Sequence, residues 1–250
     1  MKANASSSRP VRAATAGRRR PAAEPPAPKA DIYERIYTAI VEHRLLPGTK
    51  LTEERIAELF SVSRTQVRGV LQRLAVQQLV SLIPNRGAFV YMPSADEARD
   101  VLAVRRTLEP AVLDRLIRRI AAGKAPGAVA ELRALVTRER QAHAAGDRRS
   151  AVRLSGEFHV TLAVLTGSSI LSRMLRELTP LTCLAILAFE APTAAACPND
   201  EHERLVDAIE AGDQRTAAAL MVEHLNHIEH SLRLDAEEPA EVDLAAVLLG

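Results

Sequence analysis

The chain has 250 residues, which is enough for more than one domain with a buried core. Its net charge of +2 hides an uneven distribution. Lys and Arg outnumber Asp and Glu by seven to one in residues 1–30 and by eight to six in 31–93, whereas acidic residues lead by 24 to 18 in 94–250. Two cysteines, Cys183 and Cys197, exclude a disulfide framework, and the lack of a long apolar run excludes a membrane-spanning protein.

The first 30 residues are rich in Ala, Pro, Ser and Arg and contain almost no large apolar side chain. They cannot bury a core, so we predict a disordered basic tail over residues 1–30. The run Arg18-Arg19-Arg20 would suit DNA phosphates, although a solvated tail is the simpler interpretation. The same segment lacks the apolar centre of a secretory signal, which together with the cysteine count favours a reducing, cytoplasmic location.

A first helix is predicted over 31–43, with Ile32, Ile36, Ala39 and Ile40 facing inward. A short helix over 53–60 follows the turn at Pro47-Gly48, and its apolar face would be Ile56, Leu59 and Phe60. These two helices would form the scaffold of a domain over residues 31–93.

The helix that follows carries the functional argument. Ser63 and Gln66 have the spacing of a capping box, which predicts that the helix begins there. The inward face has helical periodicity and comprises Val67, Val70, Leu71 and Leu74. The other side carries Arg64, Thr65, Arg68 and Gln72, placed where recognition helices meet base edges and phosphates.

A two-stranded hairpin is predicted after this helix, from two apolar runs over 80–83 and 88–91. The residues between them, Pro84-Asn85-Arg86-Gly87, have the composition of a turn, and Arg86 beside Gly87 would suit a phosphate or a minor groove. Helix, turn, helix and hairpin make a winged helix-turn-helix, which predicts binding to double-stranded DNA. Each arginine taken alone would be an ordinary solvated residue.

Everything after Pro93 has helical periodicity, beginning with a second capping box at Ser94 and Glu97. We predict an all-α bundle over 94–234, with breaks at Gly and Pro residues that include Pro180, followed by a C-terminal tail over 235–250. The predicted helices span 95–122, 126–145, 148–166, 169–178, 181–191, 200–211 and 213–234. The fold class is therefore mainly α.

Three histidines, His159, His202 and His224, fall in three different predicted helices beside apolar residues. Imidazoles from separate helices of a bundle can converge on one metal ion. The alternative is that each is an ordinary core or surface histidine, and spacing alone does not distinguish the two.

The run from Leu45 to Val90 resembles the DNA-binding domain of the GntR family of bacterial transcription regulators. The shared landmarks are Leu46-Pro47-Gly48, Leu51, Ala57, Val62-Ser63-Arg64, Val67-Arg68, Arg73-Leu74, Leu79 and Asn85-Arg86-Gly87. The resemblance implies that DNA is contacted by Arg64, Thr65, Arg68, Arg86 and Gly87. Two positions depart from it: Gly69 interrupts the recognition helix, and Glu54 stands where some relatives carry a DNA-contacting arginine.

The second half resembles the FCD-type effector domain of the FadR-like branch of that family, over about 95–232. The motifs are VRRTLEP, EFH, TGSS, EHERLVDAIEAGD and ALMVEHL. The resemblance implies a metal held by His159, His202 and His224, with Ser155 in place of the family's fourth ligand, an aspartate. It therefore implies a weaker three-histidine site for zinc or nickel, completed by water or by an effector beside Ser155. It also implies that Arg105 grips an effector carboxylate.

The sequence thus predicts a cytoplasmic, homodimeric repressor that reads a palindromic operator and responds to a metal and a small carboxylate. One alternative is a metal-dependent enzyme activity in the helical domain, because three histidines with an open position resemble a catalytic zinc site. Another is a repressor that needs no effector.

Overall fold

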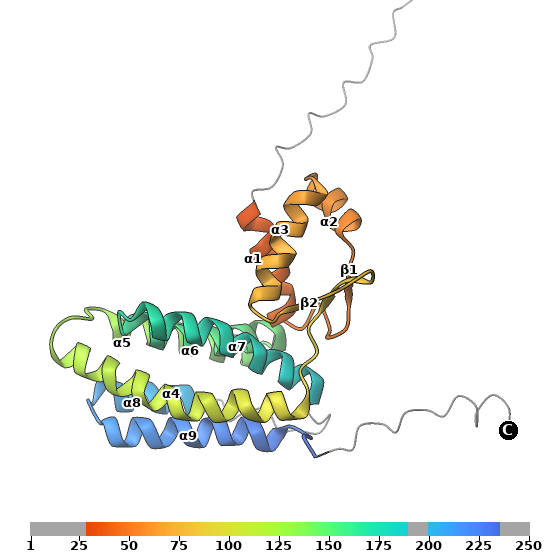
Figure 1. Cartoon of the computed structure of the whole chain (residues 1–250). Coiled ribbons are helices and arrows are strands. Elements are labelled where there is room, and N and C mark those ends of the chain that lie inside the picture. Colours follow the sequence, from red (N-terminus) through yellow and green to blue (C-terminus); the bar gives the residue numbers. More distant parts are fainter. Residues whose placement is uncertain (1–28, 190–199, 236–250) are drawn as a thin grey trace, which may run out of the picture.

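The computed structural model describes residues 29–189 and 200–235 and shows a small winged-helix domain standing on a larger helical bundle (Figure 1). Helices α1 to α3 and a three-stranded sheet form the winged-helix domain, and α4 to α9 form the bundle. This confirms the predicted fold class. None of the described helices combines the length and the apolar character that a membrane crossing requires.

The winged-helix domain is organised around α3 (Arg64–Val76), which packs against α1 (Lys29–Val41) and α2 (Glu53–Phe60). The predicted capping box is present: the backbone N–H of Gln66 donates to the Ser63 hydroxyl, and the Ser63 N–H donates back to the Gln66 side chain. The predicted inward residues of α1 and α3 are all buried, namely Ile32, Ile36, Ala39, Ile40, Val67, Val70, Leu71 and Leu74.

The inward face of α2 differs from the prediction at one residue. Ala57 is buried, with Ile56 and Phe60 packed against the same core, but Leu59 is 66% exposed. At about 100° per residue, Leu59 lies roughly 110° away from the centre of an apolar stripe that runs between Ile56 and Ala57. The periodicity of eight residues was too short to fix which apolar side chain would be left in solvent.

The sheet runs in the order β1-β3-β2 and is antiparallel throughout. Strands β2 (Val80–Ile83) and β3 (Gly87–Val90) form the predicted hairpin, and β1 (Lys50–Leu51) adds a short third strand that the sequence did not indicate. Two residues give no alternation to detect. Asn85 and Gly87 at the tip have positive φ angles of 60° and 101°, which let the chain reverse and present the wing.

The bundle begins with α4 (Ala95–Ala121), whose N-terminus is held by the predicted Ser94–Glu97 capping box. The other helices are α5 (Ala128–Ala144), α6 (Arg148–Leu165), α7 (Ser169–Phe189), α8 (Glu201–Glu210) and α9 (Gln214–Ser231). Helix α4 packs along α9, α5 along α6, and α6 along α7, so the apolar core lies between two layers of helices (Figure 1).

The predicted helix break at Pro180 is wrong, because α7 continues through it from Ser169 to Phe189. A proline inside a helix removes one backbone hydrogen bond and crowds the preceding turn. Here the loss is compensated by packing, since the run Thr179 to Ala185 is buried without interruption. Helix α7 lies against α4 and α6 on one side and α1 on the other. These contacts keep the parts of α7 before and after Pro180 in one continuous helix.

The two domains meet along α7. Leu184 is fully buried in the core of the winged-helix domain, although it belongs to a bundle helix. Beside it, the His43 Nε2–H donates to the backbone carbonyl of Cys183 at 3.1 Å. An ion pair of 3.0 Å between Arg153 of α6 and Glu42 at the end of α1 closes the same interface.

Candidate functional site

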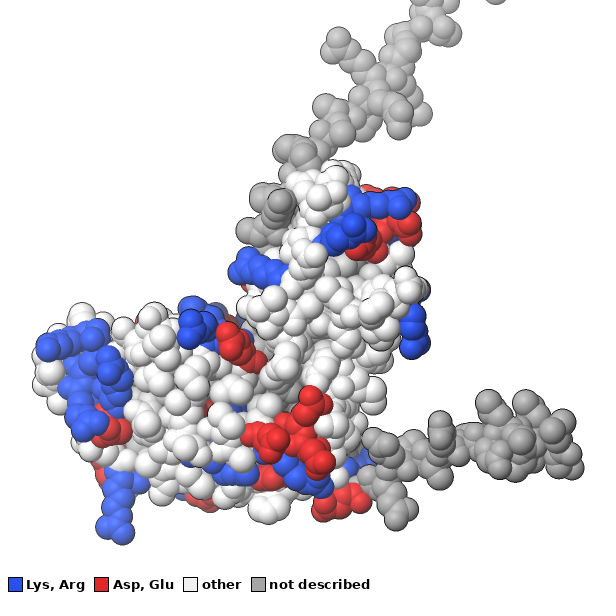
Figure 2. Space-filling view, in the orientation of Figure 1, with Lys and Arg blue, Asp and Glu red and all other residues white. Residues whose placement is uncertain are grey.

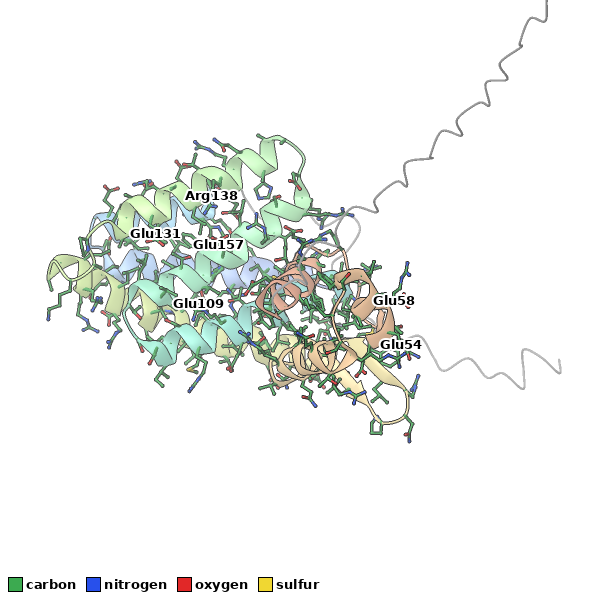
Figure 3. The ribbon with its side chains drawn as sticks, turned by 90° about the horizontal axis from the view of Figure 1, so that it is seen from above. Glu54, Glu58, Glu109, Glu131, Arg138 and Glu157 are labelled. Carbon is green, nitrogen blue, oxygen red and sulfur yellow. The ribbon has the colours of Figure 1, made fainter. Side chains whose placement is uncertain are left out.

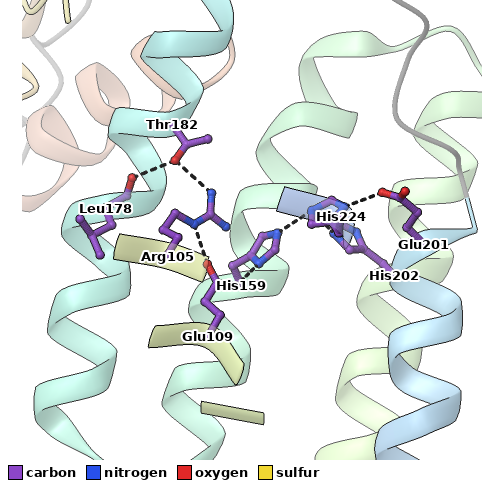
Figure 4. A network of polar contacts seen from close by, with 8 residues as sticks. All are labelled: Arg105, Glu109, His159, Leu178, Thr182, Glu201, His202 and His224. Atoms are coloured by element: carbon purple, nitrogen blue, oxygen red, sulfur yellow. Dashed lines mark hydrogen bonds and ion pairs between the residues drawn. The ribbon is translucent and has the colours of Figure 1, made fainter. Parts of the chain in front are cut away.

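Three helices of the bundle bring three histidines together (Figure 4). His159 comes from α6, His202 from α8 and His224 from α9, and all three side chains are buried. The Nε2 atom of His224 lies 3.2 Å from that of His159 and 3.3 Å from that of His202. The structure therefore brings together the three histidines singled out in the sequence, and each turns its Nε2 atom toward the other two.

Each imidazole is held from behind by its own glutamate. The Nδ1 atoms lie 2.6 Å from Glu109 for His159, 2.7 Å from Glu139 for His202 and 2.6 Å from Glu201 for His224. An ionised carboxylate only accepts hydrogen bonds, so each Nδ1 carries the proton and donates it. The opposite nitrogen, Nε2, then presents a lone pair toward the centre of the cluster.

Lone pairs converging at 3.2–3.3 Å repel one another unless a cation lies between them. Two nitrogens bound tetrahedrally to one zinc ion at its usual bond length are about 3.3 Å apart. The three candidate ligand atoms all lie within 4.8 Å of one another. A carboxylate behind each ligating imidazole is also the usual outer shell of a metal site. The donor set therefore fits a divalent, imidazole-binding metal.

The electrostatics of the cluster keep the imidazoles of His159 and His224 neutral. Burial lowers the pKa of His159 to about 3 and also lowers that of His224. Burial acts in the opposite direction on Glu109, but Arg105 and His159 outweigh it and lower its pKa to about 2. Neutral imidazoles backed by ionised carboxylates are the protonation states that metal binding requires.

Arg105 lies beside the cluster and is 1% exposed. Its Nε donates to Glu109 Oε1 at 2.6 Å, and its Nη1 donates to the Thr182 hydroxyl at 3.0 Å. Its third nitrogen, Nη2, is buried with no partner among the described residues. Because the other oxygen of Glu109 holds His159, one carboxylate links Arg105 directly to the histidine cluster (Figure 4).

Ser155 lies one helical turn before His159 on α6 and is partly buried. This places it on the same face of the helix as the histidine. Its neutral hydroxyl adds no negative charge to the site, in contrast to the three glutamates that stand behind the imidazoles.

The predicted DNA-contacting residues are all exposed and lie on two elements of the winged-helix domain. Arg64, Thr65 and Arg68 are on the outer side of α3, and Arg86 and Gly87 are at the tip of the wing. Figure 2 shows Lys and Arg side chains at this outer end of the molecule, with Asp and Glu side chains interleaved among them.

Sequence reasoning missed the three glutamates behind the histidines. Glu109, Glu139 and Glu201 are 50, 63 and 23 residues away from their partners, so no local motif joins them. The one available signal was an acidic residue within a buried helical stripe, which is costly unless it is paired. His227 also donates to Glu201, at its other oxygen.

Comparison with known proteins gives two family matches that together span most of the chain. Residues 28–90 match the model described as bacterial regulatory proteins, gntR family, and residues 100–227 match the FCD domain. The second match alone covers half of the sequence.

Individual proteins agree with these matches. An uncharacterized HTH-type transcriptional regulator in an unstable DNA locus of Streptomyces ambofaciens is 27% identical over 221 residues, which cover 84% of this chain and 88% of that protein. The HTH-type transcriptional repressor RspR of Escherichia coli is 34% identical over 84 residues, 34% of this chain and 37% of that protein. The crystal structure of a putative GntR transcriptional regulator from Rhodococcus sp. RHA1 superposes with a TM-score of 0.72 at 22% identity, covering 84% of this chain and 99% of that one.

Proposed function

Because this chain belongs to the GntR family of bacterial transcription regulators and carries an FCD effector domain, we propose that it is a metal-loaded repressor released or retained on DNA by a small carboxylate. Its relatives are regulators that bind DNA through this helix-turn-helix, and they are not enzymes. What remains to be assigned is the metal, the effector and the contacts with DNA.

The observation that carries the metal assignment is the set of three Nε2 lone pairs facing one another, each backed by a glutamate. His159, His202 and His224 would hold zinc or nickel, both of which accept imidazole ligands. Bound there, the ion would supply a Lewis-acidic position open to an oxygen ligand. With Ser155 in place of a carboxylate, the protein itself supplies three strong ligands, and water or the effector completes the shell.

The carboxylate effector is supported by the unpaired nitrogen of Arg105. A buried guanidinium N–H without an acceptor costs free energy, and a carboxylate would relieve that cost through a charge-assisted hydrogen bond. We place the effector between Arg105 and the open side of the histidine cluster, near Ser155. Repression as the direction of regulation is proposed by analogy with RspR, which is a transcriptional repressor.

DNA would be bound by a homodimer at a palindromic operator, because one recognition helix reads only a half-site. Arg64, Thr65 and Arg68 would enter the major groove, and Arg86 and Gly87 would follow the backbone beside it. We expect these events in the bacterial cytoplasm, where the operator is.

The metal site is tested by His202→Ala, with His230→Ala as the matched control on exposed α9 surface. After loading with zinc or nickel and dialysis, we expect the wild type and the control to retain about one ion per chain, as a three-histidine site requires. The His202 variant should retain far less. Equal metal content in all three proteins would contradict the site.

The effector and the operator are tested together by selecting bound duplexes from random DNA, with and without a panel of organic acids. Arg105→Lys keeps the charge but loses the planar fork, so we expect it to lose the acid response while still binding DNA. Arg106→Lys, at the neighbouring position, is the control. Unchanged DNA affinity of the wild type across the panel would instead indicate a repressor that needs no effector.

A further inference from the structure

The two arginines on the outer side of α3 are not free cations, because each is paired with a glutamate at the start of α2. The Arg68 Nε donates to Glu53 Oε1 at 2.9 Å, and its Nη2 donates to Glu53 Oε2 at 2.8 Å. Arg64 Nη1 lies 2.8 Å from Glu54 Oε1. Both arginines remain more than 60% exposed while paired, so they are held and still accessible.

We propose that Glu53 and Glu54 are positioning residues that direct these arginines to base edges and away from phosphates. The proposal rests on the DNA-contact roles of Arg64 and Arg68 proposed above. It assigns a function in recognition to two acidic side chains on a surface that must approach a polyanion.

The geometry of the Arg68 pair supports this assignment. A guanidinium has five N–H donors in a fixed plane, and Glu53 occupies the edge formed by Nε and Nη2. At the other end of the guanidinium, one N–H of Nη1 and the remaining N–H of Nη2 point in parallel and are not used by Glu53. Guanine is read by such a pair on its O6 and N7 atoms. Arg68 can therefore be held by Glu53 and present a complete fork to a base at the same time.

Charge supports the same division of roles. Each glutamate cancels the charge of its arginine, so the four side chains together add nothing to the attraction of the domain for phosphates. A carboxylate close to the DNA backbone would also be repelled by it. The hydrogen bonds from Arg68 lower the pKa of Glu53, so its negative charge is maintained at neutral pH.

The wing provides the contrast. Lys50 and Arg86 both lie over the ring of Phe89, each about 5.8 Å from its centre, and neither has an acidic partner in the described part of the chain. Uncompensated cations on a partly buried aromatic ring suit phosphates. The domain thus carries free charge on the wing and compensated charge on the recognition helix. Figure 3 shows Glu54 and Glu58 together at the end of the winged-helix domain that faces away from the bundle.

The test is Glu53→Gln, which keeps the size of the side chain and removes its charge, with Glu58→Gln as the matched control. Glu58 is on the same helix and pairs with Arg55 rather than with the recognition helix. Affinity for the selected operator and for a scrambled duplex of equal length is measured over a range of salt concentrations, and thermal melting checks that each variant folds.

We expect Glu53→Gln to bind the scrambled duplex more tightly and to steepen the salt dependence by about one unit of log K per log salt, as one released cation requires. The ratio of operator to scrambled affinity should fall about tenfold, within what one bidentate base contact contributes. Glu53→Asp should restore most of that ratio. Glu58→Gln should behave like the wild type.

The proposal is overturned if Glu53→Gln leaves both the salt slope and the affinity ratio where Glu58→Gln leaves them. It is also overturned if the variant loses affinity for both duplexes in equal proportion. Arg68→Ala separates this failure from failure of the proposed contact: if that variant loses operator affinity while Glu53→Gln has no effect, Arg68 is a contact residue and only the role of Glu53 is wrong.

Discussion

At the scale of single residues, the candidate site depends on side chains with two different partners at once. Glu109 uses one carboxylate oxygen for Arg105 and the other for His159. Glu201 likewise accepts from His224 and His227, whose hydrogen bonds lower its pKa against the opposing effect of burial. The carboxylate of Glu109 joins the proposed effector site to the proposed metal site, and that of Glu201 fixes the orientation of His224, a proposed metal ligand.

Glu201→Gln tests the contribution of this outer shell. The amide keeps the volume but removes the negative charge that orients and polarises His224, so we expect metal affinity to fall roughly 10- to 100-fold. Glu203→Gln, on the same helix and in an exposed pair with Arg140, is the control. Competition against a chelator measures both. If the two variants release metal equally, the carboxylate behind His224 has no role in holding the ion.

At the scale of elements, features set by neighbouring residues were predicted well from the sequence, and features set by contacts between distant residues were not. The capping boxes at Ser63 and Ser94 are local chemistry, and both helices begin where the sequence predicted. Pro180 is also a local signal, but tertiary packing on both sides of α7 overrides it. The three histidines were noticed because each lies in a predicted helix beside apolar residues, and the resemblance to the FCD domain identified them as ligands. Their carboxylate partners depend on how the helices cross, which no periodicity encodes.

Helix α3 contains an exposed glycine whose cost can be measured. Gly69 has helical backbone geometry, and a Cβ built there meets nothing within 4 Å. We expect Gly69→Ala to raise the free energy of unfolding by about 0.5–1 kcal/mol, because alanine loses less backbone entropy on folding. Urea titration measures the change, with the exposed Gln72→Ala as the control. A lower or unchanged midpoint would contradict the expected cost of glycine at this position.

At the scale of the whole molecule, α7 belongs to both domains. Thr182 accepts from Arg105 in the bundle, and the carbonyl of Cys183 accepts from His43 at the end of α1. Leu184 then enters the core of the winged-helix domain. Three consecutive residues therefore run from the proposed effector site to the DNA-binding domain, and any shift of α7 on effector binding reaches α1 without an intermediate element.

Leu184→Ala tests whether this contact contributes to the stability of the winged-helix domain. Truncating a fully buried leucine leaves a cavity and costs about 2–5 kcal/mol. We expect the loss to lower the melting temperature of the winged-helix domain. Calorimetry measures this temperature, and the fluorescence of Tyr33 and Tyr37 on α1 reports unfolding of that domain. Leu205→Ala, buried in the bundle core alone, is the control. An unfolding profile identical to that of the control would mean that Leu184 stabilises the bundle only.

The shared core has a consequence for exchanging parts between such regulators. A chimaera that joined residues 31–93 to the effector domain of another regulator would lack Leu184, which completes the core of the winged-helix domain. The other effector domain would need an apolar side chain the size of leucine at the position on its own helix that corresponds to Leu184 on α7. Chimaeras of this kind should therefore depend on whether the recipient provides a side chain that takes the place of Leu184 and groups that pair with His43 and Glu42.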